Sequence, residues 1–267
     1  MHYQGGIIME IIKINDSRYD IYEELLIKRD TLKKEADISL TLYINRFGEL
    51  ITAVFQKKID CISRKKAITF CNMYKNRDKP IDYNALKEYI QKCTEEYREQ
   101  LAQMIEENEN CKNLKIIPEA VALQVKKLYR KIAKQIHPDM NPITADDPIF
   151  LDLWQRIDIA YRYNDLEEMQ KLEILVAKAL EMAGCGTIVI DIPDIDEKIA
   201  EVEDEIEKIT TTDPYMYKFL LEDEEACREK EKGLKAELEE YEKYDNELKD
   251  ILKQYVKSGV TITWEMN

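Results

Sequence analysis

The feature that most constrains this chain is the stretch of residues 17–76, which contains one glycine and no proline. Apolar side chains recur there at helical spacing, for example from Leu40 to Val54. Turns and strands normally draw Gly and Pro, yet the whole chain of 267 residues has only seven of each. We therefore predict an all-α protein, with one or two long helices in this stretch.

Later helices are bounded by recognisable start and stop signals. Pro80 marks a turn, after which Asp82 or Asn84 can cap a helix over 84–109. Pro118 precedes a helix over 119–136. Asp147 followed by Pro148 predicts a further helix over 148–163, because a carboxylate can cap the first amides and Pro suits the first helical position. One more helix ends at Gly184.

The C-terminal part shows a heptad pattern. Apolar residues from Ile192 to Ile209 are spaced 3, 4, 3, 4, 3, and a second helix is expected over 215–256 after the turn "TTTDPY". The short connection predicts an antiparallel coiled-coil hairpin. We also allow one minor two-stranded β pairing, between residues 187–190 and the alternating tail "GVTITWE". The expected division is 1–116 (N-terminal helical region), 117–183 (central module) and 184–267 (hairpin).

Composition excludes several classes of function. The net charge is −14, which argues against a general nucleic-acid binder. The six cysteines form no Cys-x-x-Cys pair, and neither histidine lies near two of them, so we expect reduced thiols and no metal site. No apolar run reaches the roughly 18–20 residues of a membrane span, and the N-terminus makes a poor signal peptide. We therefore expect a cytoplasmic protein without cofactor or membrane contact.

The most informative stretch is "LYRKIAKQIHPDMNP", because it contains a helix with two opposed faces. At about 100° per residue, the apolar residues fall on one side and the cations on the other. The apolar face consists of Val125, Leu128, Tyr129, Ile132 and Ile136. The basic face consists of Lys126, Lys127, Arg130, Lys131 and Lys134. Like charges at i, i+4 do not stabilise a helix, so this face suits an acidic partner.

A tripeptide ends the basic helix. Pro138 disfavours helix in the residue before it, so His137 is expected to lie exposed at the helix tip with Asp139 beside it. The next helix carries an apolar stripe that can pack antiparallel on the apolar face of the first helix. Its members are Phe150, Leu153, Trp154, Ile157, Ala160 and Tyr161.

These two segments together resemble a J domain, the module of DnaJ-type cochaperones. "VKKLYRKIAKQIHPDMNP" is similar to helix II and its loop, and "FLDLWQRIDIAYRYND" is similar to helix III. The resemblance covers residues 119–164, with 165–183 as a candidate helix IV. It implies that His137, Pro138 and Asp139 form the loop that stimulates a DnaK-type ATPase (the seventy-kilodalton heat-shock chaperone). It also implies that the basic face docks on that ATPase, and that the protein is no enzyme and binds no ATP.

The sequence departs from the family in several places. "NLKIIPEAVAL" lacks the usual Tyr-x-x-Leu-Gly helix I, which is missing, replaced, or supplied by helix 84–109. Met140 stands where a Lys is common. No Gly/Phe-rich linker or cysteine-rich zinc region follows the module. The resemblance therefore assigns no client and no role to residues 1–116 or 187–267.

Three alternatives remain beside the cochaperone hypothesis. The first is a non-enzymatic coiled-coil scaffold with a degenerate, inactive J-like module, which binds a further protein partner through the C-terminal hairpin. The second is an enzyme that uses His137 and Asp139 as an acid–base pair; it is disfavoured because no second histidine, Gly-rich phosphate loop or Gly-x-Ser-x-Gly elbow accompanies them. A nucleic-acid role for the basic helix is disfavoured by the overall charge.

Overall fold

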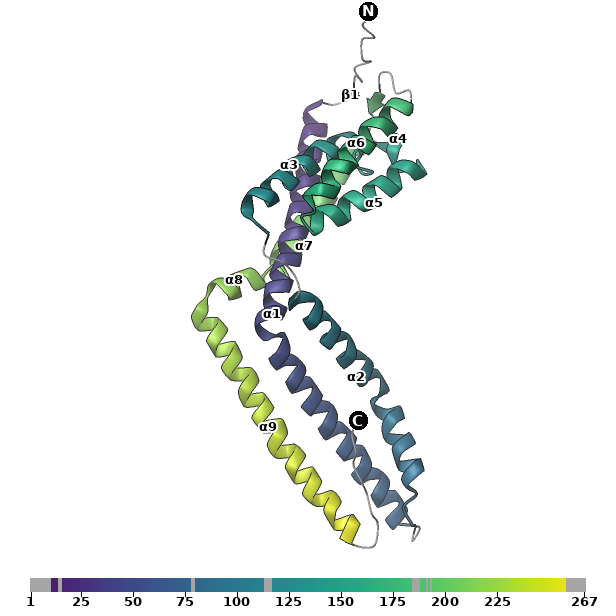
Figure 1. Ribbon diagram of the computed structural model, residues 1–267, viewed down its shortest axis with the longest axis vertical. Helices are drawn as coiled ribbons and strands as arrows, with labels where there is room; N and C mark the ends of the chain where they lie inside the picture. Colours follow the sequence, from purple (N-terminus) through teal and green to yellow (C-terminus); the bar gives the residue numbers. More distant parts are fainter. Residues whose placement is uncertain are drawn as a thin grey trace, which may run out of the picture. The chain divides into compact units, whose positions relative to one another are not determined.

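The computed structural model describes residues 11–13, 16–77, 80–112, 117–183, 188–190, 192 and 194–257 (Figure 1). Over these residues the fold is all-α, as predicted, apart from one short sheet. The helices are α1 (Asp16–Lys75), α2 (Tyr83–Lys112), α3 (Glu119–Ile136), α4 (Pro142–Ala145), α5 (Pro148–Arg162), α6 (Leu166–Met182), α7 (Ile195–Thr211), α8 (Tyr217–Glu222) and α9 (Glu224–Lys257).

The sheet joins β1 (Ile11–Lys13) and β2 (Ile188–Ile190) as parallel neighbours, with Ile11 opposite Ile188. The sequence pattern pointed to a strand at this position but to the C-terminal tail as its partner. That tail lies outside the described residues, and the pairing that the structure shows is with β1.

Aspartates cap several helices where the sequence placed helix starts. The Asp147 carboxylate accepts from the amide of Ile149, and Pro148 occupies the first helical position of α5. Asp82 accepts from the amides at the start of α2. The helix expected over 215–256 is instead interrupted at Asp223, whose carboxylate accepts from the amides of Glu225 and Ala226 and so begins α9.

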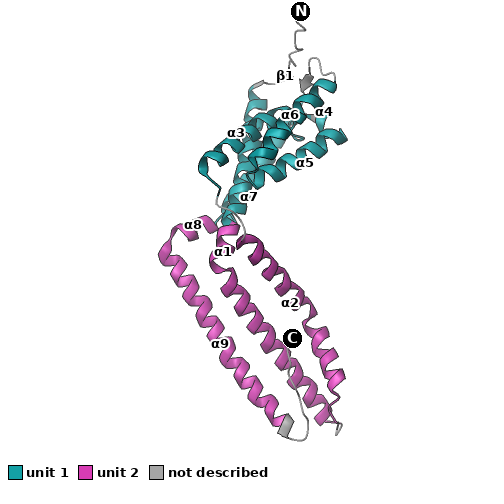
Figure 2. Cartoon of the chain, in the orientation of Figure 1, with its two compact units in different colours: residues 1–39, 115–216 teal, residues 40–114, 217–267 magenta. Residues whose placement is uncertain are grey.

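The chain forms two compact units that cut across the expected division (Figure 2). Unit 1 comprises residues 1–39 and 115–216, and unit 2 comprises residues 40–114 and 217–267. The single helix α1, of 60 residues, therefore contributes its first part to unit 1 and the rest to unit 2. The expected N-terminal region 1–116 is divided instead, since residues 16–39 group with the central module in unit 1 and residues 40–112 belong to unit 2.

The predicted α7–α9 hairpin is also wrong, because α7 belongs to unit 1 and α9 to unit 2. The heptad seam of α7 is buried in the core of unit 1 through Ile199 and Val202, whereas Leu252 of α9 packs in a cluster with Ala67 of α1. A heptad pattern shows that a helix has an apolar seam, but it does not say which helix covers that seam.

The core of unit 1 draws on α1, α3, α5, α6 and α7. It includes the apolar residues predicted for the J-like module. Val125, Tyr129, Ile132, Ile136, Phe150, Leu153, Ile157, Ala160 and Tyr161 are buried, and Leu128 and Trp154 are partly buried against them. From α1 it takes Tyr19, Tyr22 and Leu26, each at most 3% exposed. The first part of α1 is thus a structural member of the module.

Unit 2 has its own core, in which Phe70 of α1, Leu86 of α2 and Leu252 of α9 lie in one cluster. An ion pair between Arg64 and the buried Asp245 also links α1 to α9 in this unit. Among the helices that the structure describes, none is both long and apolar enough to cross a membrane.

Candidate functional site

Helix α3 ends where the proline requires it to end. The His137 amide makes the last helical bond, to the carbonyl oxygen of Ala133, and the backbone then turns extended with ψ of 125°. The His137 carbonyl accepts from the amides of Met140 and Asn141, which closes a compact turn. We call residues 137–140 the loop, and α3, the loop and α5 the J-like hairpin.

The basic face of α3 lies largely in solvent. Lys127, Arg130, Lys131 and Lys134 are exposed, and Lys126 is half-buried. Two of these cations already have acidic neighbours in the chain. Lys131 lies 2.7 Å from Glu173 of α6, and Lys134 pairs with Glu23 of α1.

The expectation of an exposed His137 is wrong. The residue is 2% exposed, and its ring packs against Trp154 at a centroid distance of 4.5 Å. Its Nε2 lies 3.3 Å from Oδ2 of Asp30 in α1, and its Nδ1 accepts from the Asp139 amide at 3.0 Å. The physical reason is the first part of α1, which packs against the end of α3 and which the sequence pattern alone did not place there.

Asp30 is the polar centre of this contact. Its Oδ2 also accepts from the Tyr129 hydroxyl at 2.6 Å, and its Oδ1 lies 3.0 Å from Nε of Arg29. Burial by itself raises the pKa of Asp30, but the hydrogen bond from His137, the Arg29 charge and the Tyr129 hydroxyl outweigh it and lower that pKa to about 2. Burial and the adjacent Asp30 carboxylate raise the pKa of Tyr129, which keeps its hydroxyl protonated as a donor.

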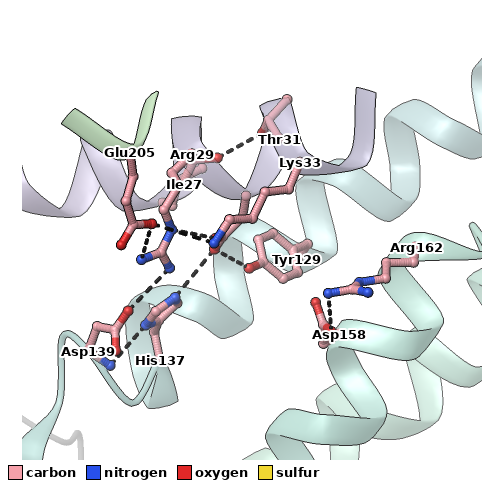
Figure 3. Close-up of polar contacts among 11 residues, drawn as sticks. Ile27, Arg29, Thr31, Lys33, Tyr129, His137, Asp139, Asp158, Arg162 and Glu205 are labelled. Atoms are coloured by element: carbon pink, nitrogen blue, oxygen red, sulfur yellow. Dashed lines mark hydrogen bonds and ion pairs between the residues drawn. The ribbon is translucent and has the colours of Figure 1, made fainter. Parts of the chain in front are cut away.

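Asp139 is held from the same helix but stays accessible. Its carboxylate lies 3.2 Å from Nη2 of Arg29, and its side chain is 44% exposed. The Arg29 guanidinium also lies 3.7 Å from Glu205 of α7, so one cation joins the loop, α1 and α7 (Figure 3). Asp139 is therefore the charged group of the loop that a partner can reach.

The suggestion that helix 84–109 supplies a helix I is wrong, because α2 belongs to unit 2. The first part of α1 packs on the J-like hairpin instead. Met140 is fully buried, and its carbonyl accepts from the Tyr19 hydroxyl at 3.4 Å. In the sequence, the apolar spacing of Tyr19, Tyr22 and Leu26 is the signal for this packing. It predicts that the three side chains are buried, but not which helices they pack against.

This segment of α1 is firmly attached to the module. Fully burying one large apolar side chain stabilises a fold by about 1.5–3 kcal/mol, and Tyr19, Tyr22 and Leu26 are all buried. These buried contacts make the first part of α1 an integral part of the core of unit 1.

Within the described ranges no group of three or more His, Cys, Asp or Glu side chains is arranged to hold a metal ion. Comparison with protein-family models, with curated proteins and with solved structures finds no match for this chain.

Proposed function

We propose that the protein is a cytoplasmic cochaperone that docks on a DnaK-type ATPase through the basic face and the loop, and stimulates its ATP hydrolysis. The observation that carries this proposal is the solvent-exposed row of cations on α3. The His-Pro-Asp turn follows this row directly, and the His137 ring packs against Trp154 of α5. A bare His-Pro-Asp tripeptide would be weak evidence. Here it sits on a buried hairpin core, with the acidic member of the tripeptide accessible to a partner.

Charge supports a specific acidic partner. The chain has a net charge of −14, so repulsion disfavours most approaches by an acidic protein. Exposed Lys127 and Arg130 create a local positive surface that favours one orientation of approach. Because Lys131 and Lys134 already pair with glutamates of this chain, we expect Lys127 and Arg130 to contribute most to docking.

A scaffold function with an inactive J-like hairpin is the second candidate. The observation that favours it is the burial of His137, whose ring nitrogens both have partners within the chain. On that hypothesis the loop is only a helix connection, and function resides in another surface of the helices. The two candidates differ in whether the folded protein changes ATP turnover by the chaperone.

The experiment is a steady-state ATPase assay of a purified DnaK-type chaperone, with the full-length protein added over a range of concentrations. The test variant reverses Lys127 and Arg130 to Glu. The matched control reverses Lys171 and Lys178, which are exposed on α6 of the same unit. The cochaperone hypothesis predicts stimulation that the first variant loses and the control retains. Equal behaviour of the two variants would reject the basic face as the docking surface.

A further inference from the structure

The burial of His137 raises a problem for a docking loop. With α1 in place, the imidazole is 2% exposed and a partner protein cannot touch it. The first part of α1 is held by buried Tyr19, Tyr22 and Leu26, so it does not leave on encounter. If the loop acts on a partner, His137 must act from inside the folded unit.

The hydrogen bonds around the ring show how it can do so. The amide of Asp139 is a donor, so Nδ1 of His137 must be the unprotonated acceptor. The ring proton is then assigned to Nε2, which donates to the Asp30 carboxylate at 3.3 Å. Asp30 thereby selects the tautomer that can hold the Asp139 backbone. The Trp154 ring fixes the plane of the imidazole.

The Asp139 side chain is fixed separately. Arg29 donates to its carboxylate at 3.2 Å, while the Arg29 Nε is held by Asp30. The Arg29 side chain is itself only 12% exposed, so it is anchored, whereas the carboxylate that it orients is 44% exposed. Two neighbouring residues of α1 therefore determine both the backbone and the side chain of Asp139.

We infer that Arg29 and Asp30 are positioning residues of the docking loop: Asp30 acts through His137 on the Asp139 backbone, Arg29 orients the Asp139 carboxylate, and Asp139 is the group that the chaperone contacts. This inference deepens the proposed function and depends on it. It gives α1, which lies more than 100 residues upstream in the sequence, a role in shaping the loop. Neither the basic face nor the His-Pro-Asp tripeptide indicates this role.

The same contacts could have the opposite role, in which Arg29 occupies the Asp139 carboxylate and competes with the chaperone for it. If Arg29 merely occupied the carboxylate of Asp139, its removal would free that group and increase stimulation. If Arg29 positions the carboxylate, its removal decreases stimulation. The sign of the effect of Arg29→Ala therefore separates the two.

The first readout is the tautomer of His137, measured by nitrogen NMR of the imidazole ring. The chain has only two histidines, so the His137 signals are assigned by their absence in His137→Gln. We expect one ring nitrogen with hydrogen attached, Nε2, and one without. Asp30→Asn is expected to disturb this pattern, because Asp30 accepts at both of its oxygens and an amide has only one acceptor oxygen. Glu24→Gln, an exposed position on the same helix, is the matched control.

The second readout is stimulation of the DnaK-type ATPase by the same proteins, each checked by thermal unfolding. We expect Asp30→Asn and Arg29→Ala to raise the half-maximal concentration about tenfold while still folded, because each removes a hydrogen bond made by a charged group. Glu24→Gln should match wild type. Unchanged stimulation in Asp30→Asn, increased stimulation in Arg29→Ala, or a wild-type Nδ1–H tautomer would overturn the inference. If the NMR spectra show the expected tautomers but the wild-type protein does not stimulate the ATPase, the proposed function is wrong. The docking role of Asp139 is then wrong as well.

Discussion

Nε2 of His137 lies 3.3 Å from Oδ2 of Asp30, a residue that precedes it by 107 positions. The contact joins the tip of the basic helix to the first part of α1, and it shows that the J-like hairpin is completed by a distant segment of the chain. It also places the histidine of the tripeptide inside the unit and leaves Asp139 as its accessible charge.

The pH dependence of stability tests the charge of Asp30. Its folded-state pKa of about 2 is below its ordinary value of 3.8, so the charged carboxylate stabilises the folded state above that ordinary value. The contribution is lost as pH falls through the folded-state pKa. From this difference we expect Asp30→Asn to lower the free energy of unfolding by about 2 kcal/mol at neutral pH.

Denaturant unfolding of wild type and Asp30→Asn at several pH values measures this effect. The difference between the two proteins should shrink mainly between about pH 4 and pH 2. Glu24→Gln should show no comparable difference at any pH. A difference for Asp30→Asn that stays constant down to pH 2 would mean that the carboxylate charge is not what stabilises the contact.

Two substitutions of His137 separate a turn-forming role from direct contact with the chaperone. Asn can accept the amide of residue 139 through its own side chain, as in an Asx turn, which reproduces the bond made by Nδ1. Gln is longer and is not expected to close that turn. We expect His137→Asn to keep part of the ATPase stimulation and His137→Gln to lose it, with both proteins less stable. Equal loss at matched folded concentrations would argue for an imidazole that contacts the partner.

Salt should weaken docking through the basic face. Exposed charges are screened at distances beyond about 8–10 Å at physiological ionic strength, and Lys127 and Arg130 are exposed. The half-maximal concentration for stimulation should therefore rise with added salt in wild type. It should rise much less in a Lys127→Gln, Arg130→Gln variant, in which the two charges are removed rather than reversed, so that part of the stimulation is expected to remain. The Lys171→Glu, Lys178→Glu variant should keep the wild-type salt dependence; parallel curves for all three proteins would contradict an electrostatic docking surface.

Substitution by alanine at two glycines of unit 2 is expected to change the free energy of unfolding differently. A Cβ at Gly233 of α9 meets no atom within 4 Å, so Gly233→Ala should stabilise the helix by about 0.5–1 kcal/mol. A Cβ at Gly48 of α1 would collide with the Asn108 side chain, which donates to Thr52 at 2.7 Å. Gly48→Ala should therefore bring no gain or a net loss. Thermal unfolding midpoints measure both, and an increase for Gly48→Ala equal to that for Gly233→Ala would show that Asn108 does not constrain this site.

The sequence allowed the helices of the module to be predicted because their signals are local. Apolar spacing, Pro138, and Asp147 before Pro148 act within a few residues, and α3 and α5 begin and end close to the expected positions. The basic face and the apolar face of α3 follow from the same spacing. These features need no knowledge of the remaining chain.

Long-range packing could not be predicted in the same way. Tyr19, Tyr22 and Leu26 form a stripe that any apolar surface could cover, so the sequence did not place them against the loop. The spacing in α7 likewise predicts an apolar seam, but it does not identify the helix that covers the seam, and the expected partner over 215–256 is wrong. The burial of His137 follows from the packing of α1, and for this reason its exposure was predicted incorrectly.

The most direct test of the central claim is the rate of ATP hydrolysis by a DnaK-type chaperone with increasing amounts of the full-length protein. We predict saturable stimulation that disappears in His137→Gln and in the Lys127→Glu, Arg130→Glu variant. No stimulation by folded wild-type protein at saturating concentrations would contradict the account and leave the J-like hairpin with a structural role alone.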